Sequence, residues 1–200
     1  MPGYKGIENF KDGAYDQHEF VSPWTRSAGN LDADVMILLQ DWSSSDVLNG
    51  ALDHEAASLG YTPSLPTNRN LIELVKRHFG LKIAETYVTN LFVFIKLGGI
   101  SARIPLRDAV TSASLYAVPQ IKIIKPKIAI CVGALTFNAL RRACGEPVVN
   151  LKRAESAAFS IGSVRVCGVP HTGGLGTASM GGLAAVDKFW SAAARELLPR

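Results

Sequence analysis

The 200-residue sequence has little of what marks several specialised classes of protein. Its three cysteines, Cys131, Cys144 and Cys167, are odd in number and form no CxxC. Cys131 and Cys167 lie in apolar, strand-like runs, where a cysteine is usually a small buried hydrophobe. We therefore expect neither a disulfide framework nor a metal site made of thiolates.

The sequence also lacks long apolar runs and the usual nucleotide-binding loops. No apolar run approaches the ~20 residues that span a bilayer. Residues 1–16 carry acidic side chains and no apolar core, which is not the pattern of a secretory signal. We expect a cytoplasmic protein without a membrane partner. Neither GxGxxG nor GxxxxGK[ST] follows the first predicted strand, and this disfavours a nucleotide-binding module.

What is present suits an ordinary globular domain. Hydrophobic residues make up 48% and charged residues 19% of the chain, and this length is enough to bury a core. We predict a single domain over residues 1–200, with residues 1–30 as a polar N-terminal arm packed on it. Lys and Arg number 21 against 17 Asp and Glu, a net charge of +4, which weakly favours an anionic partner.

Apolar and β-branched runs alternate with amphipathic stretches along the chain. Strands are predicted at 33–40, 86–95, 127–133 and 163–170. Helices are predicted near 51–59 and at 68–80, 105–118, 134–145 and 183–198. Such alternation predicts an α/β fold, a three-layer α/β/α sandwich around a central four-stranded, mainly parallel sheet.

Polar side chains stand near the ends of three predicted strands. Asp41 follows the first strand, Asn90 lies near the end of the second, and His171 follows the fourth. In parallel sheets the ligand binds beyond the carboxyl ends of the strands. Each residue alone is ordinary, because a strand-end Asp usually caps a turn and a single His is usually structural. Together they predict a carboxylate, an amide and an imidazole at one rim.

The segment that begins with His171 reads HTGGLG, with glycines at 173, 174 and 176. Glycines permit close backbone approach and let a loop move. The large side chain in this segment is the apolar Leu175, which a phosphate-binding loop or a plain turn does not need. An apolar tip on a mobile loop suits a wedge that enters a base stack, as enzymes that extrude a base require.

With these residues in place, the sequence resembles the uracil-DNA glycosylase superfamily. The resemblance rests on LLQDWSS after the first strand, VTNLF on the second and HTGGLG after the fourth. PKIAICVGALTFNAL and GGLAAVDKFW also look like superfamily segments, so the likeness spans about residues 33–195. Each motif is short, and their shared order makes the resemblance specific.

The resemblance implies the hydrolysis of the N-glycosidic bond of uracil in DNA, as in base excision repair. Asp41 would stabilise the sugar cation and orient the attacking water. His171, as a neutral imidazole, would donate a hydrogen bond to uracil O2. Asn90 would read the O4 and N3 edge and so reject cytosine. No cofactor is expected, and three cysteines cannot supply the four ligands of the iron–sulfur cluster found in some branches.

The resemblance also assigns binding residues and shows departures from the pattern. Gln40, Trp42 and Leu65 would contact uracil, with Tyr61 as a second candidate to stack on the base. Ser43 stands where the best-known branch has a tyrosine that excludes thymine. The expected DNA contacts are Ser43, Ser44, Lys96, Thr172, Gly173, Gly174, Leu175 and Gly176. Further candidates for phosphate contacts are Arg103, Arg153 and Lys188. The expected partner is single- or double-stranded DNA containing uracil, bound by a monomer.

Two other functions stay open at this stage. A protein of the same fold could bind uracil or abasic sites in DNA without turnover, since binding and catalysis would use the same groups. A serine hydrolase could use the cluster at 43–45 with His171, although no GxSxG turn is present.

Overall fold

The computed structural model describes residues 1–16, 21–151 and 157–197. Within them the strands form one five-stranded sheet in the order β2-β1-β3-β5-β4. The strands are β1 (Val35–Asp41), β2 (Tyr87–Phe92), β3 (Ile128–Val132), β4 (Phe159–Ile161) and β5 (Val164–Val169). β2, β1, β3 and β5 are parallel, and β4 pairs antiparallel with β5. The predicted α/β class and mainly parallel sheet are confirmed.

The sheet has one strand more than predicted among the described residues. The added β4 spans three residues at the sheet edge and joins β5 through a tight turn at Gly162, where φ is +60°. Three residues are too few to show a periodic pattern, so the run was not predicted as a strand. A two-residue Gly-Ser connection between apolar runs is nevertheless a hairpin signal, and it is the feature that could have revealed this strand.

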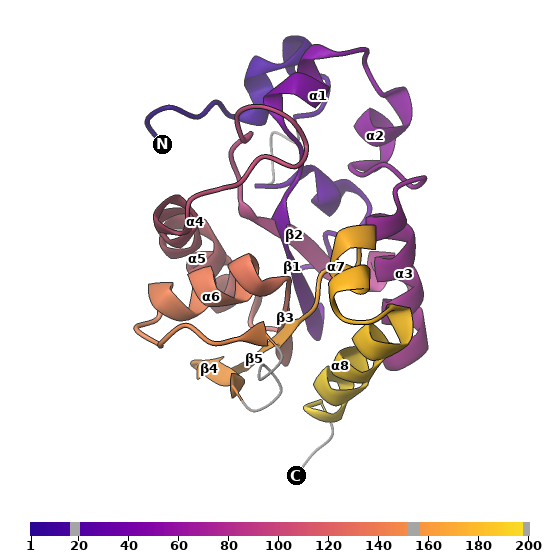
Figure 1. Ribbon diagram of the computed structural model, residues 1–200, viewed down its shortest axis with the longest axis vertical. Coiled ribbons are helices and arrows are strands. Elements are labelled where there is room, and N and C mark those ends of the chain that lie inside the picture. Colours follow the sequence, from indigo (N-terminus) through magenta and orange to yellow (C-terminus); the bar gives the residue numbers. More distant parts are fainter. Residues whose placement is uncertain (17–20, 152–156, 198–200) are drawn as a thin grey trace.

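Helices cover both faces of the sheet (Figure 1). On one face lie α3 (Pro66–Phe79) and α8 (Leu183–Arg195), which share a core with Ile37 of β1. On the other lie α4 (Leu106–Ser112), α5 (Val118–Ile124) and α6 (Ala134–Ala143), which share a core with Leu38. Neighbouring residues of a strand point to opposite faces, so the continuous apolar run of β1 fills both cores.

The predicted helix at 105–118 is part of a longer helical segment. α4 begins after Pro105, as expected, but the chain continues through a π-helical turn, η5 (Ala113–Ala117), into α5. Pro119 has no N–H for a bond to the carbonyl four residues back. A wider turn just before it is the local adjustment that lets the helix continue.

The N-terminal arm is more buried than its polar composition predicts. It holds the short 3-10 helices η1 (Ile7–Asn9), η2 (Lys11–Gly13) and η3 (Pro23–Arg26). Tyr15 and Trp24 are each only 2% exposed. The Val88 N–H donates to the Ala28 carbonyl at 2.8 Å, and Gly29 bridges to Tyr87. The arm is thus attached directly to the edge strand β2.

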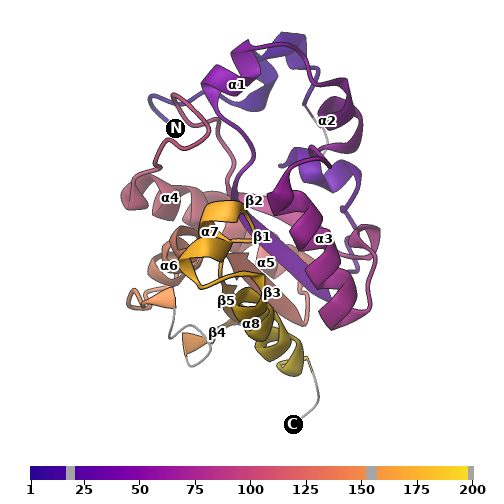
Figure 2. The same cartoon turned by 45° about the vertical axis from the view of Figure 1, so that its right-hand side comes forward.

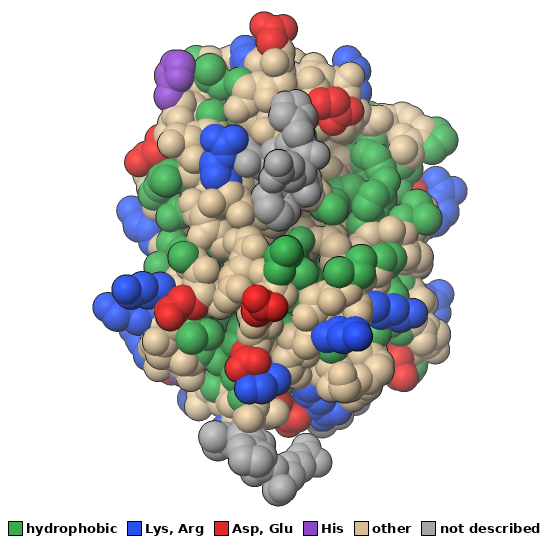
Figure 3. Space-filling view, turned by 180° about the vertical axis from the view of Figure 1, so that it is seen from behind, with side chains coloured by type: hydrophobic (Ala, Val, Ile, Leu, Met, Phe, Trp, Pro, Cys, Tyr) green, Lys and Arg blue, Asp and Glu red, His purple; other side chains and the backbone are tan. Residues whose placement is uncertain are grey.

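Two short helices, α1 (Ser45–Asn49) and α2 (His54–Leu59), follow β1. Only the second matches the helix predicted near 51–59. Of the described helices, none has both the length and the apolar character needed to cross a bilayer. Figure 3 shows basic and acidic side chains interspersed over the face opposite to that of Figure 1. The net positive charge is therefore not concentrated on that face.

Candidate functional site at the carboxyl ends of the strands

The direction in which the sheet winds changes between β1 and β3. The chain leaves β1 toward β2 on one side, whereas it leaves β3 toward β5 on the other. In doubly wound sheets the ligand binds where the direction of winding changes in this way. Asp41 ends β1, and His171 follows β5 against the backbone just after β3. A Cβ placed on Gly133 would lie 3.7 Å from the His171 ring.

Asp41 is held by donors on both carboxylate oxygens. Its Oδ1 accepts a hydrogen bond from Gln40 Nε2 at 2.7 Å. Its Oδ2 lies 2.8 Å from Lys96 Nζ, and the two charged side chains are only 7% and 6% exposed. The carboxylate therefore has a fixed orientation inside the protein, as a group that must face a developing cation requires.

Lys96 was predicted to contact DNA phosphates, and that prediction is wrong. The residue is buried, its Nζ pairs with Asp41, and the same Nζ also donates to the carbonyl of Ile100. Its backbone is fixed as well, because the Lys96 carbonyl accepts from the Ser45 N–H at 2.9 Å. Burying a lone ammonium costs far more than pairing it, so Lys96 lies inward once Asp41 is within reach.

This burial predicts that Lys96→Met destabilises the fold. The substitution would leave the Asp41 charge buried without its partner, and the free energy of unfolding should fall by about 3–5 kcal/mol. Lys127→Met is the matched control, since Lys127 pairs with Asp34 at 2.7 Å but both side chains are exposed, at 67% and 57%. That variant should lose about 1 kcal/mol or less. Urea denaturation measures both, and equal losses would contradict a buried pair.

His171 is a neutral imidazole with its proton on Nε2. The backbone N–H of Gly173 donates to Nδ1 at 3.0 Å, so Nδ1 acts as an acceptor. Burial lowers the pKa of His171; Asp41 raises it in part, and Lys96 lowers it. Because both charges act on its pKa, His171 lies in the electrostatic field of the Asp41–Lys96 pair. Nε2–H is the donor left for a ligand.

We predict that nuclear magnetic resonance titration places the pKa of His171 below the ordinary histidine value. In Asp41→Asn this pKa should fall further, because the attraction between the carboxylate and the imidazolium is lost. The folded protein should also lose stability as the pH falls through the ordinary histidine pKa, because the unfolded chain takes up the proton more readily. A His171 pKa that rises in Asp41→Asn would rule out this electrostatic arrangement.

The segment after His171 is a short helix rather than the predicted mobile loop. α7 (Gly174–Ser179) begins directly after Gly173, and Figure 2 shows it at the end of β5. Close packing requires two of the glycines. A Cβ on Gly173 would lie 2.5 Å from Thr67 Oγ1 and 3.0 Å from the His171 ring, and a Cβ on Gly176 would lie 2.4 Å from the His171 carbonyl oxygen. A Cβ on Gly174 would meet nothing within 4 Å.

Leu175 projects from the first turn of α7 and is 85% exposed. It is thus a large apolar side chain presented to solvent close to His171, as the sequence predicts. Thr172, by contrast, is fully buried. Its hydroxyl donates to the Thr67 carbonyl at 2.9 Å, and its own carbonyl accepts from Asn70 at 2.7 Å. Thr172 therefore fastens α7 to α3 and cannot contact DNA as predicted.

Asn90 is 1% exposed, and its polar atoms are unequally satisfied. Its Oδ1 accepts a hydrogen bond from Ser22 Oγ at 2.6 Å. Its Nδ2 has no partner among the described residues. A buried donor without a partner costs about 1–3 kcal/mol, which a ligand acceptor or a water would recover. Among the described residues Asn90 makes no hydrogen bond to Asp41 or His171, and its place in a common site is inferred from the shared rim.

The residues predicted to hold the base have structural contacts of their own. Trp42 donates from Nε1 to the Gly60 carbonyl at 2.8 Å and packs on Tyr15, which fixes its ring. Tyr61 is stacked on Trp24 at 4.2 Å. Leu65 is 48% exposed and precedes α3. Of these three side chains, Leu65 alone is exposed.

The remaining predicted DNA contacts divide by exposure. Ser43 and Ser44 are buried, at 6% and 0% exposed, so neither offers a surface hydroxyl to phosphate as predicted. Arg103 and Lys188 are exposed and remain candidates for phosphate contacts. Arg153 lies outside the described residues.

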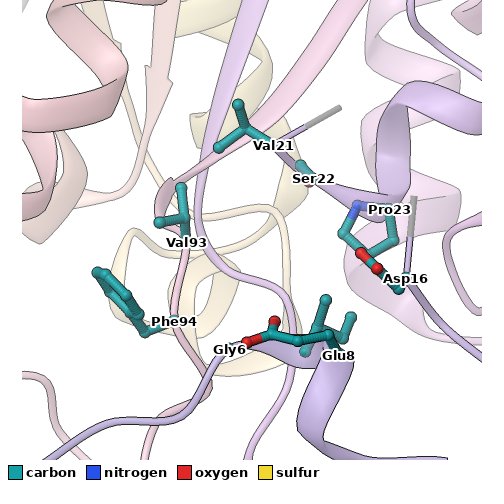
Figure 4. A pocket seen from close by; sticks show the side chains of 9 residues that line it. Gly6, Glu8, Asp16, Val21, Ser22, Pro23, Val93 and Phe94 are labelled. Carbon is teal, nitrogen blue, oxygen red and sulfur yellow. The ribbon is translucent and has the colours of Figure 1, made fainter. Parts of the chain in front are cut away.

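A cavity of about 220 Å³ lies between the arm and the chain beyond β2 (Figure 4). It is lined by Gly6, Ile7, Glu8, Asp16, Val21, Ser22, Pro23, Val93 and Phe94. The sequence does not predict this cavity, because its walls come from residues of the arm and from the chain just after β2, which are far apart in sequence. Ser22 connects the cavity with Asn90, because Ser22 lines the cavity and its hydroxyl donates to Asn90 Oδ1.

No family model matches the chain, and no curated protein sequence matches it.

Proposed function

We propose that the protein is a DNA glycosylase of the uracil-DNA glycosylase type, with the three-layer α/β/α sandwich of that superfamily. The observation that carries the proposal is His171, a neutral imidazole with its proton on Nε2, placed in the field of a fixed Asp41 carboxylate and followed by the exposed Leu175. Acid, hydrogen-bond donor and apolar wedge are the three elements that extrusion and hydrolysis of a base need.

The chemistry follows from where charge develops. As the bond between the sugar C1′ and the base nitrogen breaks, its electron pair moves onto the base and the sugar becomes cationic. Nε2–H of His171 would donate to the base carbonyl on which negative charge collects. Asp41 would stabilise the cation and orient the water that adds to C1′. Its bonds to Gln40 and Lys96 hold the carboxylate in place beforehand.

The buried Lys96 favours a second candidate, a protein that binds uracil or abasic DNA without turnover. A carboxylate 2.8 Å from an ammonium offers less net negative charge to a sugar cation than a free one does. The serine hydrolase reading has no such support. Ser44 is fully buried, and no described contact joins a serine hydroxyl to His171.

Release of uracil from an oligonucleotide is the direct test. Wild-type protein should produce strand scission after alkali on uracil-containing DNA and none on a thymine control, with EDTA present throughout. Asp41→Asn, once thermal unfolding shows that it is folded despite the unpaired Lys96, should lower the single-turnover rate at least about 10²-fold while DNA affinity stays within about threefold, because the carboxylate acts on the transition state. Tight binding without scission by the wild type would favour the second candidate.

Leu175→Ala tests the wedge separately. Because Leu175 would fill the space that an extruded base leaves in a stack, its loss should slow uracil release from duplex DNA about tenfold more than from single strands. Single-turnover rates on both substrates give the comparison. Ala178→Ser, an exposed change on the same short helix, is the control. Equal losses on the two substrates would remove Leu175 from base extrusion.

A further inference from the structure

We propose that Ser22 is a specificity-determining positioning residue, which sets the polar atom that Asn90 offers to a bound base. The inference rests on the proposed function. Ser22 lies in the N-terminal arm and Asn90 on β2, 68 residues apart in the chain. Their hydrogen bond measures 2.6 Å, and the residues are 2% and 1% exposed. Solvent therefore does not compete for this bond.

The direction of the bond follows from what each group can do. A serine hydroxyl has one proton, which needs an acceptor, and the amide oxygen of Asn90 is the acceptor that it reaches. With the amide oxygen held on the Ser22 side, the NH₂ group is turned away from Ser22. It is this Nδ2 that has no partner among the described residues. Ser22 thus holds the amide in the orientation that leaves a donor available.

A buried donor without a partner selects for a carbonyl oxygen in the ligand. Uracil presents O4 as an acceptor, whereas cytosine presents an amino group at the same position, donor against donor. A site built to hydrogen-bond one of them rejects the other because its own polar group stays unpaired. If the amide were free to turn, its oxygen could accept from the cytosine amino group and the selection would weaken. The selection therefore depends on the fixed orientation of the Asn90 amide as well as on its presence.

Ser22 itself is held firmly. Its carbonyl accepts from Thr25 Oγ1 at 2.6 Å, and the following turn, η3, carries Trp24, which is stacked on Tyr61. Ser22 and Val93 both line the cavity in Figure 4, and Val93 lies three residues beyond Asn90. The arm therefore forms part of the base-recognition site instead of merely covering the sheet.

The test compares Ser22→Ala with two related variants. Ser22→Thr keeps the hydroxyl and should behave as the wild type. Ser27→Ala is the matched control, because Ser27 is an arm serine whose Oγ donates to the Leu59 carbonyl at 2.7 Å, away from Asn90. Each protein is titrated with single-stranded oligonucleotides that contain one uncleavable 2′-fluoro-deoxyuridine or 2′-fluoro-deoxycytidine. Thermal unfolding checks that each variant is folded.

We expect wild type, Ser22→Thr and Ser27→Ala to prefer the uridine oligonucleotide about tenfold or more, and Ser22→Ala to lose most of that preference. An unchanged preference in Ser22→Ala overturns the role of Ser22 while leaving the glycosylase proposal intact. Equal binding of both oligonucleotides by the wild type contradicts the proposed function. In that event the nuclear magnetic resonance signals of the Asn90 side-chain NH₂ test the hydrogen bond between Ser22 and Asn90 directly. They should shift in Ser22→Ala and not in Ser27→Ala, and an unchanged spectrum in Ser22→Ala also overturns the inference.

Discussion

The buried ion pair between Asp41 and Lys96 is the interaction on which the rest of the site depends. It connects the end of β1 to the segment beyond β2 across 2.8 Å, in a place where each side chain is almost wholly excluded from water. Either charge alone would be very unfavourable there. Their pairing holds the segment beyond β2 against the end of β1, and both charges influence the pKa of His171. A carboxylate that is also bonded by Gln40 has little freedom to turn.

A second constraint concerns His171 and Asn90. In each side chain one polar atom is hydrogen-bonded within the protein, and this determines which atom is left for a ligand. The backbone of Gly173 uses Nδ1 of the imidazole and thereby leaves Nε2–H. Ser22 uses the amide oxygen of Asn90 and leaves Nδ2. Both residues are thus prepared as donors, and a donor suits a carbonyl oxygen of a pyrimidine but not an amino group. A site of this kind is selective because its own polar groups stay unpaired in the wrong complex.

Much of the fold could be predicted from the sequence, because buried parallel strands are marked by apolar runs such as the one that forms β1. The short edge strand β4 could not, since three residues at an edge have no periodicity. The places of Asp41 and His171 at strand ends and the exposure of Leu175 could also be predicted, because strand ends and glycine-rich segments are local signals. The burial of Lys96 and the contact of Ser22 with Asn90 depend on partners 55 and 68 residues away in sequence, from 96 to 41 and from 22 to 90. Such pairings are set by topology, and no local pattern encodes them.

We propose that Asp41, Asn90 and His171 together bind a single pyrimidine turned out of DNA. A crystal structure of the protein with a duplex that contains one 2′-fluoro-deoxyuridine tests it most directly. We expect the extruded base at the strand ends, with a carbonyl oxygen within hydrogen-bond distance of His171 Nε2, C1′ beside the Asp41 carboxylate and Leu175 in the vacated stack. A uridine that stays stacked in the duplex, or a base bound away from His171, would contradict it.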